Sequence, residues 1–373
     1  MLCTGARILL ESLKREGVDL FFGYPGGAVI DIYDELSNHP DLRHILVRHE
    51  QGAVHAADGY ARACGKVGVC LATSGPGATN TVTGIATAYS DSIPMVIFTG
   101  QVSTPLIGND AFQEVDIIGI TRPCTKHNFL VKDVKDLAET VRKAFYLARS
   151  GRPGPVLVDI PKNIQQASCE FVWPEDVVMR SYCPTFRANL NQLRRAMDVL
   201  VTSRKPLIVA GGGVIMANAA EELCTLAHLM HAPVCSTLMG LGAFPGDDPL
   251  WIGMLGMHGT FAANRAVTQA DVILAVGARF DDRVTGKLSQ FAPNARIVHI
   301  DIDPTTLRKN VRVEVPVVSD ALSALQGLRS ILESGHAQKD WAGDHADWMG
   351  QVLEWQKEHP LSWAKGDVLK PQQ

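Results

Sequence analysis

The sequence lacks several features, and each absence removes a class of protein. No apolar run is long enough to cross a bilayer. Residues 1–15 place charged side chains among the apolar ones, unlike a secretory signal peptide. Lys+Arg 35 against Asp+Glu 39 give a net charge of −4, so no basic surface for nucleic acid or anionic lipid is expected. We predict a soluble, cytoplasmic protein whose partners are small molecules or other proteins, with no nucleic acid and no membrane among them.

Cysteine is present but never in a metal-binding or disulfide pattern. The 8 cysteines are scattered, with no Cys-x-x-Cys and no Cys/His cluster at zinc spacing. This distribution favours a reducing compartment in which several cysteines act as small core residues. We therefore expect no metal ligand among the residues of this chain.

An alternation of two periodicities indicates an α/β protein. With 46% hydrophobic and 20% charged residues, the 373-residue chain can bury roughly two domain cores. Short β-branched runs alternate with helix-period segments, the pattern of parallel βαβ units. The predicted strands of the first half are 43–48, 67–72, 95–99 and 155–160, and its predicted helices are 51–63, 80–90 and 134–149.

The same periodicities divide the chain into segments. Residues 1–165 form one predicted α/β domain and 189–335 a second, with strands at 206–210, 272–276 and 296–300. Polar and proline-containing residues 166–188 read as a linker. Apolar residues at seven-residue spacing through Trp341, Trp348 and Trp355 predict a helix within a connector at 336–373. The expected fold is two doubly wound parallel-sheet domains.

Three motifs in the first domain follow predicted strands: Gly23-Tyr24-Pro25-Gly26-Gly27-Ala28, Arg48-His49-Glu50-Gln51, and Ser74-Gly75-Pro76-Gly77-Ala78-Thr79-Asn80. Glycine-rich turns let a flat ring approach the backbone, and Glu50 stands where α/β sheets bind ligands. Asn80 is placed at a helix start, which favours anions. The alternative is that Glu50 is an ion-paired surface group and that the glycines form plain strand-to-helix turns.

The second domain carries four further motifs: Gly211-Gly212-Gly213, Gly256-Met257-His258-Gly259-Thr260, the stretch from Gly277 to Gly286, and Asp301-Ile302-Asp303-Pro304. A glycine-rich turn before a helix could receive a pyrophosphate, although such turns are common. The alternative for Arg279 and Arg283 is pairing with Asp281 and Asp282 on a solvated loop.

Together these motifs resemble the pyrimidine-binding and FAD-binding central domains of thiamin-diphosphate enzymes, most closely acetolactate synthase large subunits. The resemblance implies that Glu50 drives the cofactor's aminopyrimidine to its imino form. It implies that Gly27 and Gln113 shape the reacting centre and that Lys162 is a basic residue at its entrance. Tyr24, Pro76 and Asn80 would contact the same cofactor.

The resemblance also assigns a flavin and a substrate pocket. The implied FAD contacts are Arg152, Gly211, Gly212, His258, Gly277, Arg279, Asp281, Val284, Asp301, Ile302 and Asp320. The implied substrate residues are Phe112, Met257, Asp282 and Arg283. An arginine there suits an acceptor 2-ketoacid, because a planar guanidinium grips a carboxylate with paired hydrogen bonds. Without the resemblance, Phe112 would read as core and Gln113 as solvated.

The activity implied is decarboxylation of pyruvate and its ligation to a second 2-ketoacid, the first common step of valine, leucine and isoleucine synthesis. Relatives of this kind carry a third α/β domain for Mg2+ and the diphosphate, and we expect this chain to stop before it and to be inactive alone. A homodimer or tetramer and a small regulatory subunit are also implied. Two alternatives stay open: another thiamin-diphosphate decarboxylase or oxidase, and a non-catalytic FAD-binding assembly partner.

Overall fold

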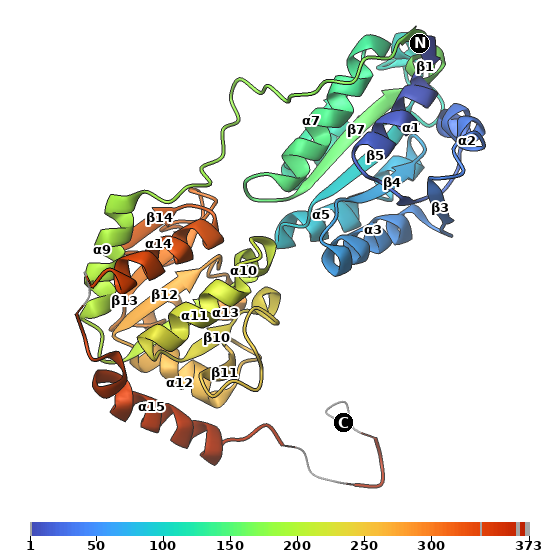
Figure 1. Ribbon diagram of the computed structural model, residues 1–373. Coiled ribbons are helices and arrows are strands. Elements are labelled where there is room, and N and C mark those ends of the chain that lie inside the picture. The colour runs from blue at the N-terminus through green and yellow to red at the C-terminus, as the bar shows by residue number, and fades with distance from the viewer. Residues whose placement is uncertain (1, 336–337, 363–365, 370–373) are drawn as a thin grey trace. The chain divides into compact units, whose positions relative to one another are not determined.

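The computed structural model describes residues 2–335, 338–362 and 366–369 (Figure 1). Of the predicted connector 336–373, residues 336–337, 363–365 and 370–373 lie outside the described residues. The chain divides into two compact units, Met1–Cys183 and Pro184–Gln373. No helix of the described residues combines the length and apolar character that a bilayer crossing needs.

The first unit is built on a six-stranded parallel sheet in the order β3-β2-β4-β5-β7-β6. Its strands are β2 (Leu20–Gly23), β3 (Arg43–Leu46), β4 (Gly68–Ala72), β5 (Met95–Gln101), β6 (His127–Leu130) and β7 (Pro155–Pro161). Every residue of β4, β5 and β7 is buried, as expected for the continuous apolar runs of a parallel sheet covered on both faces.

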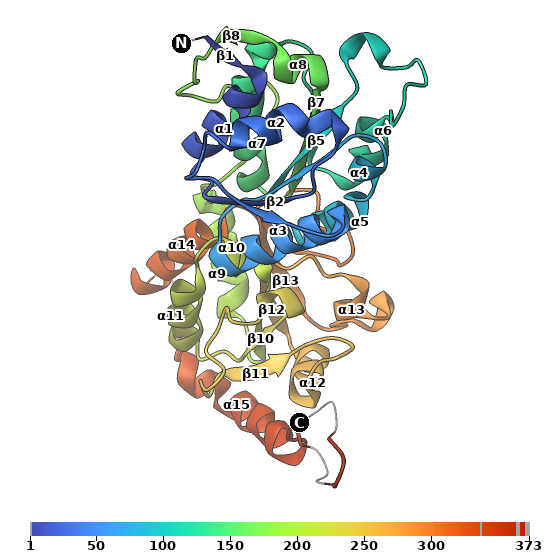
Figure 2. The same cartoon turned by 90° about the vertical axis from the view of Figure 1, so that its right-hand side faces the viewer.

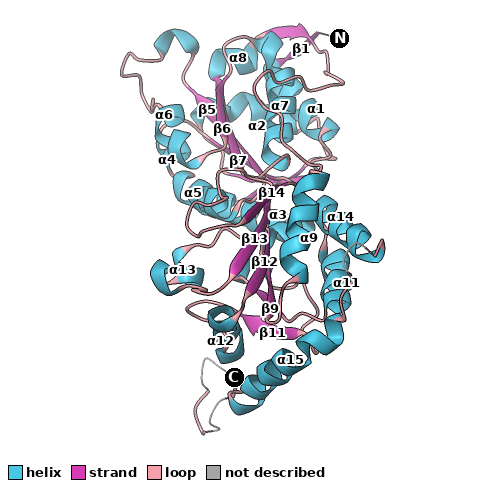
Figure 3. Ribbon diagram, turned by 90° about the vertical axis from the view of Figure 1, so that its left-hand side faces the viewer, coloured by secondary structure: helices cyan, strands magenta, loops and turns pink. Residues whose placement is uncertain are grey.

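Helices cover both faces of this sheet (Figure 2, Figure 3). Contacts group α1 (Gly5–Arg15), α2 (Ile30–Leu36), α7 (Leu137–Arg149) and α8 (Lys162–Gln166) with one another, and α3 (Glu50–Cys64) with α5 (Val82–Asp91). Two short helices, α4 (Pro76–Thr79) and α6 (Ile117–Thr121), complete the unit. The first residues of the predicted linker belong to this unit, because β8 (Ser168–Glu170) pairs antiparallel with β1 (Leu2–Thr4).

The second unit repeats the architecture, with parallel strand order β11-β10-β9-β12-β13-β14. The strands are β9 (Pro206–Ala210), β10 (Val234–Ser236), β11 (Trp251–Met254), β12 (Val272–Val276), β13 (Arg296–Asp301) and β14 (Val315–Val318). The helices are α9 (Leu190–Val201), α10 (Gly212–Met216), α11 (Ala220–Met230), α12 (Phe261–Gln269), α13 (Asp282–Thr285), α14 (Ala321–Glu333) and α15 (Trp341–Glu358). The predicted doubly wound parallel-sheet fold is therefore confirmed in both units.

In each sheet there is one pair of adjacent strands from which the chain continues toward opposite edges of the sheet. In the first unit it moves from β2 outward to β3 and then returns to β4 on the other side of β2. In the second it moves from β9 to β10 and β11 and returns to β12. The carboxyl ends of such strand pairs open a crevice in which α/β sheets bind ligands. These two crevices, β2/β4 and β9/β12, are called the switch points below.

The strand predictions at 206–210 and 272–276 are confirmed residue for residue by β9 and β12. The predicted helix 80–90 is wrong at its start. Asn80 ends the short helix α4 as its C-cap, and α5 begins only at Val82. The apolar periodicity runs through both helices, so it could not reveal the break. Asn80 therefore does not lie at a helix N-terminus.

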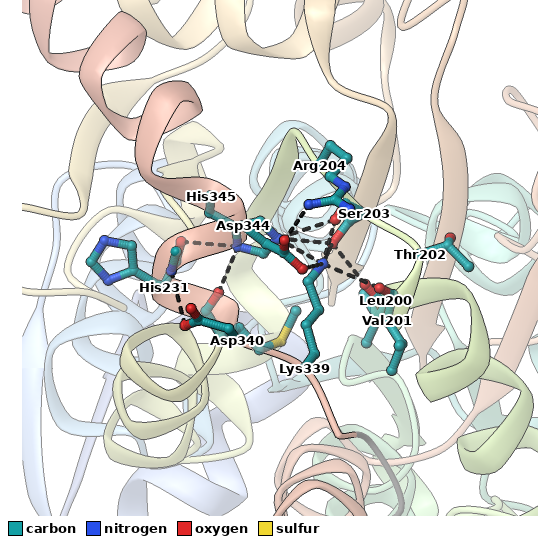
Figure 4. Close-up of polar contacts among 12 residues, drawn as sticks. Leu200, Val201, Thr202, Ser203, Arg204, His231, Lys339, Asp340, Asp344 and His345 are labelled. Atoms are coloured by element: carbon teal, nitrogen blue, oxygen red, sulfur yellow. Dashed lines mark hydrogen bonds and ion pairs between the residues drawn. The ribbon is translucent and has the colours of Figure 1, made fainter.

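Helix α15 is anchored to the second unit by a buried lysine (Figure 4). The Lys339 ammonium donates to the carbonyl oxygens of Val201, at 3.1 Å, and of Ser203, and lies 3.0 Å from His345 Nε2. His345 is fully buried and its Nδ1 donates to Met230 O at 2.9 Å. Burial lowers the pKa of Lys339. Trp348 adds an indole hydrogen bond from α15 to β9.

Replacing the anchoring lysine should loosen α15. Lys339→Met leaves several buried acceptors without a donor, so we expect the free energy of unfolding to fall by roughly 1–3 kcal/mol. Lys357→Met, an exposed site on the same helix, is the matched control and should change little. Urea unfolding followed by tryptophan fluorescence measures both, and equal effects of the two variants would contradict the anchoring role.

Candidate functional site

Glu50 begins α3 and lies inside the protein. Its exposed fraction is 8%, and His49 caps the helix by accepting the Gln51 N–H at 3.1 Å. The Asn80 amide donates to Glu50 Oε2 at 2.9 Å. No group among the described residues donates to Oε1. The interpretation of Glu50 as an ion-paired surface group is wrong: the carboxylate is buried, and only one of its oxygens has a donor among the described residues.

Two glycine-rich turns meet at the β2/β4 switch point, and one of them lies against this carboxylate. A Cβ at Gly77 would lie 3.2 Å from Glu50 Oε1 and 2.6 Å from Thr73 Cγ2. A Cβ at Gly26 would lie 2.5 Å from the same Thr73 methyl, whereas one at Gly27 would meet no atom within 4 Å. The turns after β2 and β4 are thus in direct contact, and the position of Gly27 opens onto space.

The remaining residues of this edge have mixed placements. Tyr24 is 40% exposed and its N–H donates to Leu71 O at 3.3 Å, while Pro76 opens α4. Lys162 donates to Gly27 O at 2.9 Å and lies 3.9 Å from Asp31 Oδ2. The ammonium of Lys162 therefore supports the Gly27 turn directly, a contact that the sequence did not indicate.

The segment that carries Phe112 and Gln113 is folded around Glu114. The Glu114 carboxylate accepts from Gly108 N at 2.5 Å and Ala111 N at 3.2 Å, and the Gly108 bond lowers its pKa. Phe112 is 86% exposed, so its interpretation as a core residue is wrong. Gln113 is exposed, with a positive φ of 54°.

A buried acid behind this segment was not singled out by sequence. Asp159 of β7 accepts from Thr99 Oγ1 at 2.7 Å and from Gln101 Nε2 at 3.0 Å, and burial raises its pKa to about 7. Gln101 also donates to Val115 O at 3.0 Å, which ties the end of β5 to the Phe112 segment. An acid inside an otherwise apolar strand was the available signal.

Glycine contacts also build the β9/β12 switch point of the second unit. A Cβ at Gly211 would lie 2.1 Å from Gly277 O, and one at Gly213 would lie 2.7 Å from Gly277 Cα. Gly277 has a φ of 60°, which other residues rarely adopt. The Gly213 N–H donates to Gly277 O at 3.1 Å. The backbones of the two predicted ligand turns therefore touch.

A third turn reaches the same edge and was missed. The 3₁₀ turn Leu238–Gly240 follows β10, and Thr237 N donates to Ala210 O at 3.0 Å. A Cβ at Gly240 would lie 2.2 Å from Ala210 O, and one at Gly212 would lie 3.1 Å from Met239 Cβ. The signal that could have revealed this turn was the pair Gly240 and Gly242, which stands shortly after the apolar residues of β10.

The arginine-rich loop after β12 brings two predicted substrate residues together. Met257 N donates to Arg283 O at 2.8 Å, and the Arg283 guanidinium lies 3.8 Å from Met257 Sδ. Arg279 pairs with Asp281 at 3.4 Å, and Arg283 lies 3.9 Å from Asp282. The pairing that was the alternative interpretation is therefore present, yet the Arg283 side chain stays 70% exposed and available to an anion.

The other predicted flavin residues occupy several positions. Asp281 caps α13 through Val284 N at 3.1 Å, and Asp320 caps α14 through Leu322 N at 3.0 Å. Asp301 is the last residue of β13 and Ile302 follows it, and Ser319 N donates to Asp301 O at 3.1 Å, which joins the ends of β13 and β14. His258 is exposed in the second unit. Arg152 belongs to the first unit, where its Nε donates to Ser92 Oγ at 2.8 Å.

Buried His299 supports the turn at Gly277 through the carbonyl of the next residue. Its Nε2 donates to Ala278 O at 2.7 Å, next to Gly277, and Asp301 Oδ2 lies 3.8 Å away. Burial lowers the pKa of His299 to about 4. The neutral ring therefore holds the turn at neutral pH.

Two family models match the chain. The model described as thiamine pyrophosphate enzyme, N-terminal TPP binding domain, matches residues 3–120, and the central-domain model of the same enzymes matches residues 193–328. The chain belongs to the thiamine pyrophosphate enzyme family.

Within that family its relatives are acetolactate synthase large subunits. The chain is 49% identical to the Haemophilus influenzae acetolactate synthase large subunit, over 99% of this chain and 65% of the relative. It is 50% identical to the Escherichia coli acetolactate synthase isozyme 3 large subunit, over 99% and 65%. It is also 50% identical to a probable acetolactate synthase large subunit of Methanocaldococcus jannaschii, over 99% and 62%. The chain thus spans somewhat under two thirds of these relatives' length.

The two glycines of the β2 turn offer a matched test of the first switch point. Gly26→Ala forces Thr73 to move, so we expect the free energy of unfolding to fall by about 1–3 kcal/mol. Gly27→Ala meets open space and should leave stability unchanged while narrowing the ligand site. Thermal unfolding of both variants checks this, and an equally destabilised Gly27→Ala would show that the space is not there.

His299 should make the second unit acid-sensitive. The folded pKa of about 4 lies below the ordinary 6.5, so the unfolded chain binds the proton more readily between these values. Above pH 6.5 the protonation of His299 does not reduce the free energy of unfolding. As the pH drops toward 4, this free energy falls by up to about 3 kcal/mol. Urea unfolding across this range should show a shallower loss for His299→Gln, with exposed His55→Gln as the control. An unchanged slope in His299→Gln would contradict the assignment.

Proposed function

We propose that this chain forms the pyrimidine-binding and flavin-binding part of an acetolactate synthase large subunit. The observation that carries the proposal is the Glu50 carboxylate: it is buried, held at Oε2 by Asn80, and has no donor to Oε1 among the described residues, with Gly77 close to that oxygen. Such a group can exchange a proton with a ring nitrogen placed in the switch point. The names of the relatives and the two matched family models support the same reaction.

Thiamine pyrophosphate, when bound, supplies a carbon nucleophile that removes carbon dioxide from a 2-ketoacid and joins the remainder to a second one. Glu50 holds a proton at the pyrimidine nitrogen, and Asn80 fixes the direction from which it does so. The buried surroundings of Glu50 exclude water from this exchange. Gly27 and Gln113 shape the reacting centre, and Phe112 is proposed to meet the substrate.

The second unit is proposed to hold FAD at the β9/β12 switch point. These glycine turns fit a dinucleotide. No side chain stands where Gly211, Gly213 and Gly277 meet, so a pyrophosphate can reach the backbone there. The flavin would have a structural role. Arg283, beside Met257 and Asp282, is proposed to bind the carboxylate of the acceptor 2-ketoacid. We propose that Mg2+ and the diphosphate of thiamine pyrophosphate bind outside the two switch points.

The wider setting is also a proposal. All eight cysteines are unpaired thiols, which fits a reducing compartment such as the cytoplasm. The relatives' description as large subunits supports a small regulatory subunit as partner, and a homodimer or tetramer is proposed for the assembled enzyme. A thiamine-dependent decarboxylase or oxidase is the second candidate, and its products would be an aldehyde or an acetyl compound in place of acetolactate.

Glu50→Gln in the enzyme that carries this chain tests the proposal. The amide cannot relay a proton, so we expect the rate of acetolactate formation from pyruvate to fall by roughly 10²–10⁴-fold. Glu170→Gln, at an exposed site of the same unit, should retain the parent rate. Product analysis by chromatography separates acetolactate from acetaldehyde and acetate. A Glu50→Gln enzyme within a few-fold of the parent would refute the role, and acetaldehyde as main product would favour the second candidate.

A further inference from the structure

Three side chains of the second unit that no step above uses lie together on one side of α11. Cys224 and His228 are four residues apart, so they share a face of the helix. Asp248 comes from the segment before β11. One ligand atom from each of the three lies within 4.8 Å of the others. The separation of 20 residues between His228 and Asp248 hid this cluster from spacing rules.

The cluster is held in position before any ion binds. Asp248 Oδ1 accepts the Leu250 N–H at 2.9 Å, and Asp248 O accepts the Trp251 N–H at 2.9 Å, so the carboxylate is fixed at the start of β11. His228 Nε2 lies 2.8 Å from Asp248 Oδ2, and its ring is stacked near that of Phe244, with centroids 6.5 Å apart. A rigid helix and a tethered loop thus supply the donors.

The exposure of the donors leaves one side open. The Asp248 side chain is 13% exposed and that of His228 is 50% exposed, while Cys224 is half-buried against the core. An ion can enter from solvent and keep a water molecule as its fourth ligand. Three protein ligands with one open position are a known tetrahedral arrangement for zinc.

The chemistry of the donors selects the ion. A thiolate, an imidazole and a carboxylate together suit Zn2+ and similar borderline-soft cations, whereas Ca2+ and Mg2+ prefer oxygen ligands alone. Tetrahedral zinc would separate its nitrogen and oxygen ligands by about 3.4 Å, given metal bonds of roughly 2.1 Å. The 2.8 Å contact between His228 and Asp248 therefore needs to open by only a fraction of an ångström.

We propose that Cys224, His228 and Asp248 form a binding site for one zinc-class divalent cation. The site ties α11 to the segment before β11. Because α11 runs back toward the amino ends of β10 and β11, the cluster is near the sheet edge opposite the β9/β12 switch point. The ion therefore bridges two segments of the unit at a distance from the chemistry proposed above, and its open position distinguishes the site from structural zinc sites closed by four protein ligands.

Cobalt titration of the purified chain tests the site, because Co2+ replaces zinc and reports its ligands by absorption. We expect one equivalent of Co2+ to give a tetrahedral visible band and a thiolate charge-transfer band in the near ultraviolet. Cys224→Ser should abolish the charge-transfer band and weaken binding by more than the roughly 10–100-fold that loss of an outer-shell partner costs. Cys64→Ser, at an exposed cysteine outside the cluster, should match the parent.

The unfolding midpoint gives a second test, which is needed if Cys224→Ser folds poorly. Zn2+ should displace Co2+ stoichiometrically and raise the unfolding midpoint of the parent chain but not of His228→Gln, whose half-exposed site tolerates substitution. Absence of the charge-transfer band in the parent, or its persistence in both Cys224→Ser and His228→Gln, would overturn the proposal. The three residues would then be an ion pair beside a packed thiol.

Discussion

The close contact of two glycine-rich turns at the carboxyl edge of a parallel sheet is the constraint on which both units depend. In the first unit Gly26 and Gly77 both pack on Thr73, and in the second Gly211 and Gly213 pack on Gly277. A Cβ at any of these positions would collide with Thr73 or with the backbone of the facing turn. The same turns thus bring neighbouring strand ends into contact at the edge where α/β sheets bind ligands.

The two crevices differ in the charge that they present. The first contains a carboxylate with one oxygen held by Asn80, which suits a ring that must gain and lose a proton. The second has glycine backbone at its centre and two exposed arginines, Arg279 on the loop after β12 and Arg283 in α13, which suits phosphates and carboxylates. We propose that one architecture, used twice in this chain, provides a site for proton exchange and a site for anions.

The features that were predicted correctly from the sequence are those that a short segment of chain determines by itself. Central strands such as β9 and β12 are continuous apolar runs and were found residue for residue, and the glycine motifs were located because strand ends bind ligands. The break before α5 was missed, since apolar periodicity continues through it. The exposure of Phe112, the contact of Asn80 with Glu50, and the support of Gly27 by Lys162 depend on chain segments far apart in sequence. The roles of most site residues came from resemblance alone.

A crystal structure of the protein with thiamine pyrophosphate would test the central claim most directly. The account predicts the aminopyrimidine ring in the β2/β4 switch point, with a ring nitrogen at hydrogen-bond distance from Glu50 Oε1 and the ring beside Gly27. A ligand bound elsewhere, with Glu50 still bonded to Asn80 alone, would contradict it.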